Sequence, residues 1–351
     1  MTLELSATMT ERGLDLSMHV ETGEMLAVLG PNGSGKSTAL ALIAGLLRPD
    51  VGTASLDGRV LFDIGTPGRA PAWVPPHARG VALLAQEPLL FPHLSALDNV
   101  AFGPRSEGRP RTQSRTVAQH WLGEVDAAQY ADRRPAQLSG GQAQRIAVAR
   151  ALAADPSLLL LDEPMAALDV AVAPAVRQML RRVLQERSVV IVTHDVLDAL
   201  LLADRVLVID DGRVAEEGPT EQVLARPRSA FAARIAGLNM VRGNLDGHGV
   251  RGSDGTFVEG LTDQPISQGD PAVAVFRPSA VGVYRQPPGG SPRNVLDVTI
   301  TELAPFGEQV RVRTPLLSAD ITAAAVAELD LAPGTRVVFA VKASEVAIYR
   351  S

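Results

Sequence analysis

Nine consecutive residues near the start of the chain have the types and spacing of a loop that holds phosphate groups. They match the pattern G-x-x-x-x-G-K-[ST] with one further threonine: Gly30, Pro31, Asn32, Gly33, Ser34, Gly35, Lys36, Ser37 and Thr38. Glycines allow backbone N–H groups to turn toward an anion, and a helix that begins after the loop adds its positive end. Lys36 would contact the β- and γ-phosphates, and the Ser37 hydroxyl would bind Mg²⁺. The pattern therefore predicts a site for a nucleoside triphosphate with Mg²⁺.

Other residues capable of chemistry follow apolar runs. Asp162 and Glu163 come after four leucines, residues 158–161, that resemble a central parallel strand. Asp162 is suited to hold Mg²⁺, and Glu163 is suited to orient or deprotonate an attacking water. His194 follows the apolar run 188–193, and this strand-end position favours a functional role. The other histidines lack such a context, and we interpret them as structural or solvated: His19, His77, His93, His120 and His248.

A second glycine-containing segment opens a predicted helix. Ser139, Gly140, Gly141 and Gln142 precede a helical stretch that continues to residue 154. Glycines at a helix N-terminus can bind an anion, so we expect a second phosphate contact here.

Alternating strands and helices would position these residues. Apolar strands are expected at 25–29, 81–85, 158–161, 188–193 and 205–209, with helices at 39–47, 174–186 and 196–203. This alternation predicts an α/β fold with a doubly wound core. Residues 88–135 read as a polar, mostly helical insertion. From about residue 239 the chain becomes glycine-rich and predicts a small β-barrel-like domain, with strands at 273–276, 281–284, 295–302, 309–313 and 336–341 and one helix at 322–329.

Composition excludes several classes of protein. The 351 residues carry a net charge of −6 and no cysteine, so disulfides and thiolate metal sites are impossible and a reducing compartment is expected. We find no apolar run of the ~20 residues that cross a bilayer, and we expect no signal peptide. Aromatic residues are only 4% and no basic stripe dominates, which argues against nucleic acid as a partner. Four arginines near residue 110 are interpreted as a solvated loop: Arg105, Arg109, Arg111 and Arg115.

Taken in order, these segments resemble the ATP-binding-cassette ATPases across residues 1–235. The resemblance implies that Gln86 senses Mg²⁺ and a membrane partner, and that residues 138–142 are the signature motif covering the γ-phosphate held by the other subunit of a homodimer. Asp169, in the run Ala167-Leu168-Asp169, would lie on the D-loop, and His194 would be the switch histidine. Residues 88–137 would be the helical subdomain, and ATP with Mg²⁺ would be bound.

One departure from that family concerns the nucleotide base. The family usually places an aromatic residue against adenine near the start of the domain, but residues 7–18 contain no Phe, Tyr or Trp. Aliphatic contacts or Arg12 are the alternatives, and GTP remains an alternative substrate.

The tail resembles an oxyanion-binding, Mop/TOBE-type domain with an OB-like all-β fold, at residues 291–351, preceded by linker strands at 236–290. The resemblance lies in the segments 291–296 and 341–346, which we expect at opposite ends of a barrel, and in Phe276-Arg277-Pro278, typical of importer ATPases. Cationic and neutral donors suit a dianion such as molybdate or tungstate. The resemblance implies these oxyanion-binding residues: Ser291, Arg293, Asn294, Lys342 and Ser344.

The leading interpretation is the regulated ATPase subunit of a molybdate importer, peripheral on the cytoplasmic face of the cell membrane. Its partners would be a second copy, two permease subunits and an external substrate-binding protein. Residues 86–94 and 97–100 resemble the groove for the permease, although Phe91 and Leu94 fit a plain core equally well. The alternatives are an importer of sulfate, iron or polyamine, a soluble cassette ATPase acting on DNA or ribosomes, and an oxyanion sensor or store.

Overall fold

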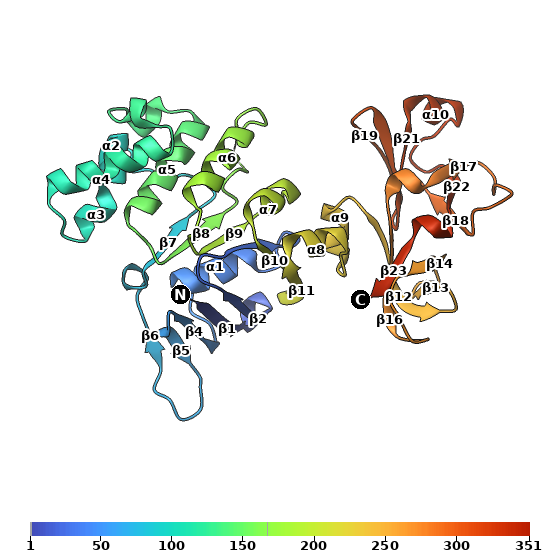
Figure 1. Cartoon of the computed structure of the whole chain (residues 1–351), viewed down its shortest axis with the longest axis horizontal. Helices are drawn as coiled ribbons and strands as arrows, with labels where there is room; N and C mark the ends of the chain where they lie inside the picture. The colour runs from blue at the N-terminus through green and yellow to red at the C-terminus, as the bar shows by residue number, and fades with distance from the viewer. Residues whose placement is uncertain (1, 167) are drawn as a thin grey trace. The chain divides into compact units, whose positions relative to one another are not determined.

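A six-stranded sheet, parallel except at one edge, forms the centre of the first of two units, Met1–Glu221 and Gln222–Ser351 (Figure 1). The computed structural model describes residues 2–166 and 168–351. The central strands are continuous apolar runs with buried side chains, which confirms the predicted α/β fold. Across the sheet the strands are β11 (Arg213–Pro219), β10 (Arg205–Asp210), β3 (Met25–Leu29), β9 (Val189–Val192), β8 (Leu158–Asp162) and β7 (Val81–Leu84).

The sheet order brings three loops together at one edge. Strand β3 pairs with β9, and β9 pairs with β8, in both cases in parallel. Their carboxyl ends therefore lie side by side, and the residues that follow them share that edge. The principal helices of this core are α1 (Lys36–Ala44), α5 (Gly140–Ala153), α6 (Ala173–Val183) and α7 (Val196–Leu202).

An antiparallel sheet packs against α1. Its strands β1 and β2 alternate buried and exposed residues, and the buried ones join a single apolar cluster with α1 and the central sheet. Asp57 and Gly58 form the turn of a hairpin in this sheet, and both have positive φ. Across the sheet the strands are β2 (Leu14–Val20), β1 (Leu3–Met9), β4 (Val51–Leu56), β5 (Arg59–Ile64) and β6 (Ala72–Trp73).

Arg79 ties this region to the end of α1. It follows the short 3₁₀ helix η2 (Pro76–Ala78) and is 1% exposed. Its Nη1 donates to the carbonyls of Leu42 and Ile43 at 2.8 and 2.9 Å, in the last turn of the helix, where carbonyls need partners from outside it. The guanidinium lies 4.5 Å from the centroid of the Trp73 ring, and burial lowers the pKa of Arg79 to about 10. The positive charge thus meets the negative end of the helix dipole instead of a carboxylate.

The insertion between β7 and β8 is helical, as predicted. It contains α2 (Ala96–Val100), α3 (Phe102–Ser106) and α4 (Arg111–Glu124), with short 3₁₀ turns η3 (Ala128–Tyr130) and η4 (Pro135–Gln137). The prediction that four arginines lie in a solvated loop was wrong for three of them, which lie on helices. Arg105 lies on α3, and both Arg111 and Arg115 lie on α4, where Arg115 binds Asp98 at 3.2 Å. Proline and glycine at 108–110 interrupt the helices for only a few residues.

The second unit combines short helices with three sheets. The strands between residues 239 and 276 form one six-stranded sheet with β23, the last strand of the chain. Most of the segment expected as linker strands therefore belongs to the same sheet as the C-terminus. The predicted domain limits stay predictions. The elements are α8 (Thr220–Ala225, which spans the division), α9 (Ala230–Ile235), β12 (Asn239–Asp246), β13 (Gly249–Gly252), β14 (Phe257–Glu259), β15 (Leu261–Thr262), β16 (Pro271–Phe276) and β23 (Ala347–Arg350).

Two three-stranded antiparallel sheets complete the second unit and share an apolar cluster with the larger sheet. The single strand predicted over 295–302 is two strands, because the chain leaves one sheet at Thr299 and enters the other at Glu302. The elements are β17 (Gly282–Tyr284), β18 (Asn294–Thr299), β22 (Arg336–Val341), β19 (Glu302–Phe306), β20 (Gln309–Arg313), β21 (Ser318–Thr322) and α10 (Ala323–Glu328).

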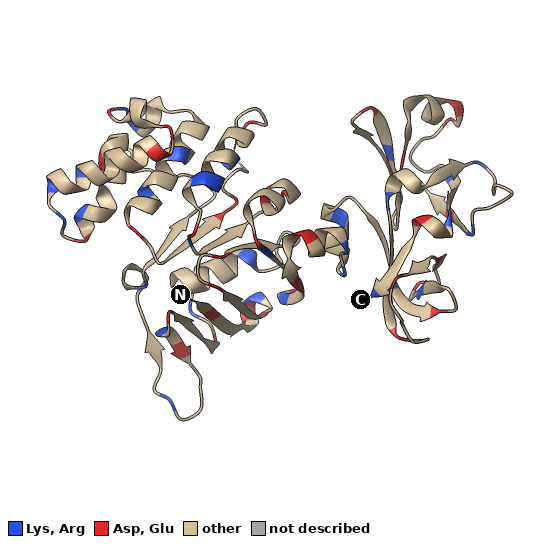
Figure 2. Cartoon of the chain, in the orientation of Figure 1, with Lys and Arg blue, Asp and Glu red and all other residues tan. Residues whose placement is uncertain are grey.

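Charge is distributed over both units. Basic and acidic residues are interspersed along the helices and strands of each (Figure 2). Within residues 2–166 and 168–351, we find no helix with the length and apolar character needed to cross a bilayer.

Candidate functional site

The glycine-rich loop joins β3 to α1 in a geometry that only glycine permits at its first position. Gly30 has φ +156°, and a Cβ there would lie 2.2 Å from the carbonyl oxygen of Ile209. Gly35 caps α1 with φ 104°, so that the helix begins at Lys36. The hydroxyl of Ser34 is buried and has no hydrogen-bond partner among the described residues. Together with the helix N-terminus, this donor fits a loop built to receive an anionic ligand.

Lys36 is held inside the loop. It is 7% exposed, and its Nζ donates to the carbonyl oxygens of Gly30 at 2.9 Å and Pro31 at 2.8 Å. Burial lowers the pKa of Lys36, and the nearby carboxylates of Glu163 and Asp162 oppose that shift. The ammonium is therefore positioned at the loop before any phosphate contact.

The two predicted Mg²⁺ ligands Ser37 and Asp162 lie close together. The Ser37 hydroxyl donates to an Asp162 carboxylate oxygen at 3.5 Å. Burial raises the pKa of Asp162, and the Ser37 hydrogen bond acts in the opposite direction. A hydroxyl and one carboxylate fit Mg²⁺, which in nucleotide sites takes few protein oxygens and completes its shell with phosphate and water. Gln86, the third predicted ligand, is exposed two residues beyond β7, and we find no side-chain hydrogen bond for it in the described part of the chain.

Glu163 and His194 meet across the ends of β8 and β9. His194 Nδ1 lies 3.4 Å from Glu163 Oε1. Glu163 has φ 45°, uncommon for a residue other than glycine, and its N–H donates to the Val192 carbonyl at 2.9 Å. That backbone bond fixes the turn after β8 and directs the carboxylate toward the histidine. The structure thus brings together five predicted residues: Lys36, Ser37, Asp162, Glu163 and His194.

The second segment predicted to contact an anion, residues 139–142, forms the capped N-terminus of α5. Ser139 Oγ accepts from the N–H of Gln142 at 3.4 Å, and Gln142 Oε1 accepts from the N–H of Ser139 at 3.0 Å. A Cβ on Gly141 would lie 2.7 Å from Val172, which explains the need for glycine there. Within the described residues, no hydrogen bond or ion pair joins residues 139–142 to residues 30–38. The N-terminus of α5 is therefore free to contact a ligand that is not bound by the phosphate loop of the same chain.

Asp169 is exposed, and its carbonyl accepts from the N–H groups of Val172 and Ala173 at 2.8 and 3.0 Å. These bonds lead the loop into α6. Ala167, named with Asp169 in the sequence motif, lies outside the described residues.

Arg12 lies beside the start of α1. It belongs to the 3₁₀ turn η1 (Thr10–Arg12) between β1 and β2, and its Nη1 lies 3.5 Å from the Thr38 hydroxyl. The alternative base contact considered from the sequence is therefore within reach of the phosphate loop.

A small cavity of about 220 Å³ lies where the helical insertion meets β7. Arg150 of α5 donates to the carbonyls of Leu89 and Pro88 at 2.8 and 3.0 Å, and the rings of Phe91 and Phe102 lie 4.6 Å apart at its edge. Leu89 is 64% exposed and Phe102 is 46% exposed. An apolar hollow with exposed apolar neighbours suits a protein partner.

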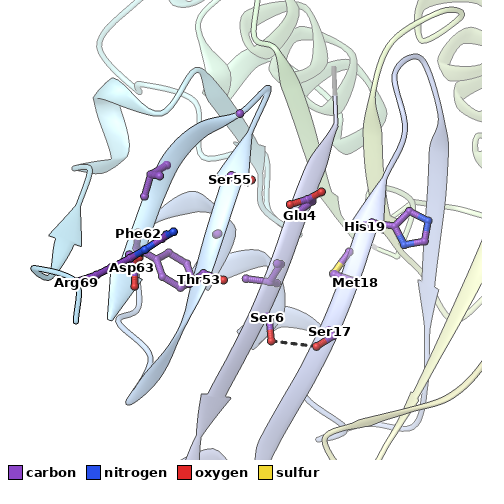
Figure 3. A pocket seen from close by; sticks show the side chains of 14 residues that line it. Glu4, Ser6, Ser17, Met18, His19, Thr53, Ser55, Phe62, Asp63 and Arg69 are labelled. Carbon is purple, nitrogen blue, oxygen red and sulfur yellow. Dashed lines mark hydrogen bonds and ion pairs between the residues drawn. The ribbon is translucent and has the colours of Figure 1, made fainter. Parts of the chain in front are cut away.

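A larger hollow of about 550 Å³ lies on the outer face of the antiparallel sheet (Figure 3). Hydroxyl-bearing residues point into it from three strands, and Asp63 with Arg69 closes one side at 3.4 Å. It contains none of the predicted site residues.

The two oxyanion-type segments of the second unit are neighbours, not opposite ends of a barrel. Asn294 at the start of β18 pairs with Val341 at the end of β22. The Asn294 side chain is 2% exposed and exchanges two hydrogen bonds with the backbone of Glu259, at 2.6 and 2.9 Å, so it holds β14. The other predicted oxyanion residues are largely exposed, and we find no side-chain ion pair for them in the described ranges: Ser291, Arg293, Lys342 and Ser344.

Comparison with known proteins gives two family matches and close relatives. A model described as ABC transporter matches residues 14–166, and one described as TOBE domain matches residues 290–348. The molybdenum import ATP-binding protein ModC of Mycobacterium tuberculosis is 52% identical over 99% of this chain and 97% of its own length. The Fe(3+) ions import ATP-binding protein FbpC 1 of Rhizobium meliloti is 39% identical over 95% and 92%.

Among solved structures, the dimeric ATP-binding cassette MJ0796, in a post-hydrolysis state bound to ADP and Pi, is similar to this chain. The TM-score is 0.53 and the sequence identity 30%, over 62% of this chain and 98% of that one. The shared region accounts for the α/β part of the fold.

Proposed function

Because the chain belongs to the ABC transporter ATP-binding proteins, we propose that it is the ATP-hydrolysing subunit of a molybdate importer. The full-length identity of 52% to a molybdenum import ATP-binding protein supports the substrate class. The contact between Glu163 and His194, beside Lys36 and Ser37, carries the proposal of hydrolysis. Sulfate, iron or polyamine import remains the alternative, and relatives such as the iron importer are less similar.

The proposed reaction follows from the strand-end residues. The backbone N–H groups of the loop and Lys36 bind the triphosphate, while Ser37, Asp162 and Gln86 would hold Mg²⁺. When bound, the metal neutralises charge on the phosphate oxygens. Glu163 orients the attacking water and accepts its proton, and His194 keeps that carboxylate aimed at the γ-phosphate. Burial raises the pKa of Asp162, and a bound cation would favour its ionised form.

A second copy of the chain completes each site in this proposal. Residues Ser139 to Gln142 of one copy contact the γ-phosphate bound by the other, and Asp169 lies at the same junction. The capped but otherwise unengaged helix start supports this role, as does the dimeric arrangement of the similar solved cassette. An exposed glycine-containing N-terminus is suited to phosphate oxygens.

The membrane partners are proposed from the apolar hollow at the helical insertion. Phe91, Phe102 and the exposed Leu89 present an apolar surface near Gln86, and it suits the coupling segment of a permease subunit. Two permease subunits, an external substrate-binding protein and a peripheral position on the cytoplasmic face of the membrane complete the assembly. Arg12 would contact the base, so discrimination between ATP and GTP should be weak.

The tail is proposed to bind molybdate as a product sensor. Arg293 and Lys342 are exposed cations on adjacent segments, and the Ser291 and Ser344 hydroxyls lie on the same two segments. A dianion needs several such donors. Asn294, whose amide already binds Glu259, would contribute by holding the segment in place.

The test is ATP turnover by the complex of this chain with its permease in vesicles. External molybdate with the substrate-binding protein should stimulate turnover, and sulfate, ferric iron and spermidine should not. Stimulation by one of the other substrates alone would assign the importer to that substrate. Turnover that no substrate changes would contradict coupling to transport.

A further inference from the structure

His194 contributes little to fixing its own position. Its side chain is 61% exposed, and the contact with Glu163 at 3.4 Å is the one ion pair found for it in residues 2–166 and 168–351. A side chain so exposed samples several rotamers unless its backbone is held. The position of the imidazole therefore depends on the residues on either side.

Both flanking residues are anchored. Thr193 is buried, and its hydroxyl donates to Asp198 Oδ2 at 2.7 Å while accepting from the N–H of Asp195 at 3.1 Å. Asp195 caps α7 by accepting from the N–H of Leu197 at 2.8 Å. The chain on each side of His194 is thus fixed to the first turn of α7.

Arg177 on α6 joins these anchors. Its Nε and Nη2 donate to Asp198 Oδ1 at 2.8 and 2.6 Å, and Nη2 also donates to Asp195 Oδ2 at 3.0 Å. The side chains of Arg177 and Asp198 are only 11% and 4% exposed. The buried carboxylate of Asp198 needs a cation, and the planar guanidinium can contact Asp198 and the partly exposed Asp195 at once. Lysine, a single point charge, would not reproduce that geometry.

We propose that Arg177 is a positioning residue for ATP hydrolysis, which acts by holding residues 193–198 so that His194 stays against Glu163. Arg177 lies on α6, the helix that follows Asp169, so its side chain links that helix to the histidine loop. It contacts neither the phosphate loop nor Glu163 in the described residues. This inference rests on the proposed hydrolysis of ATP.

The experiment compares Arg177→Met with Arg181→Met in the full-length chain. Arg181 lies on the same helix, is exposed, and has no ion pair in the described ranges, so it controls for loss of one charge on α6. Arg177→Met should lower kcat about 10- to 100-fold and leave the Kd for ATP within about threefold, because the phosphate loop is untouched. Arg177→Lys should recover only part of kcat. Arg181→Met should match the wild type.

The decisive measurement is the double variant with His194→Ala. If Arg177 acts through His194, Arg177→Met should not lower kcat further in that background. Equal losses in both backgrounds, or a wild-type kcat for Arg177→Met, would overturn the inference. If Arg177→Met does not fold, Asp198→Asn gives the same comparison, because it weakens the anchors of Thr193 and Arg177 together. Absence of turnover in the wild type would contradict the proposed function itself.

Discussion

The chain contains only two lysines, Lys36 and Lys342, and each lies in one of its two proposed anion sites. Lys36 is buried and donates to two loop carbonyls, whereas Lys342 is exposed and has no ion pair in the described residues. The nucleotide site is therefore organised by one chain before a ligand arrives, apart from the segment that we propose a second copy supplies. The oxyanion segments offer charges without an enclosing shell, which is expected of a site that forms only where another surface meets them.

The largest effect should come from the catalytic carboxylate of the organised site. Glu163→Gln keeps the side-chain size beside His194 but cannot accept a proton from water, so kcat should fall about 1,000-fold with ATP binding retained. The variant should accumulate as an ATP-bound dimer, detectable by light scattering. Unchanged steady-state turnover would remove Glu163 from its proposed role.

Replacing Lys36 or Lys342 by alanine tests whether the two proposed anion sites differ as described. Lys36→Ala should weaken ATP binding at least about 100-fold, or ~2.7 kcal/mol, because a desolvated phosphate charge loses its partner. Lys342→Ala, the matched control, should leave the affinity for ATP unchanged. Titration of both variants with a fluorescent ATP analogue measures this, and equal affinities in the two variants would contradict the distinction.

A smaller effect is expected from the tail. Cytoplasmic molybdate should inhibit ATP turnover of the permease complex roughly tenfold, if it prefers the state in which the two ATPase units are apart. Arg293→Ala with Lys342→Ala should abolish that inhibition, and linkage requires ATP to weaken molybdate binding in the wild type by the same factor. Calorimetry of the full chain measures the binding. Constant turnover up to millimolar molybdate, despite measured binding, would make the tail a dimerisation or storage module.

The smallest expected effect is on stability, and it comes from the ion pair between Glu24 and Arg205 within the first unit. Burial opposes ionisation of Glu24, but hydrogen bonds from Arg205 at 2.6 Å and from the backbone lower its pKa below the ordinary 4.5. The resulting stability is present above pH 4.5 and is lost as pH falls through the lowered value. Glu24→Gln should lower stability by about 1 kcal/mol at neutral pH and by less in acid.

Thermal unfolding at several pH values checks the Glu24 prediction. Glu4→Gln is the control, since Glu4 is exposed on β1. An equal loss for Glu24→Gln at every pH would show that packing, and not charge, is responsible.

The sequence was sufficient for the strand-end residues because their signals are local. Four leucines before Asp162 specify a buried strand, and the glycine-rich loop specifies its own turn, so both could be placed without knowing the sheet order. The pairing of distant segments could not be read in this way. Asn294 was predicted as an oxyanion contact, but the structure shows it bonded to Glu259, thirty-five residues earlier.

Arg177 was overlooked for a related reason. Its position on an amphipathic helix resembles that of any surface arginine, and only the approach of α7 buries it beside two carboxylates. The strands β12 to β15 were predicted only as linker strands without individual limits, because glycine and short length weaken the alternation that predicts a strand.

Because the guanidinium of Arg79 lies against Gly45, the substitutions tolerated at position 45 depend on the residue at position 79, and the reverse also holds. A Cβ at Gly45 would lie 2.6 Å from Arg79 Cζ, and Gly45 also has φ +82°. Any larger residue at 45 would displace the arginine and remove its hydrogen bonds to the carbonyls of Leu42 and Ile43. Conversely, a smaller residue at 79 would remove the steric barrier but not the backbone strain at 45. Change at one of these positions therefore constrains which later changes the other can accept.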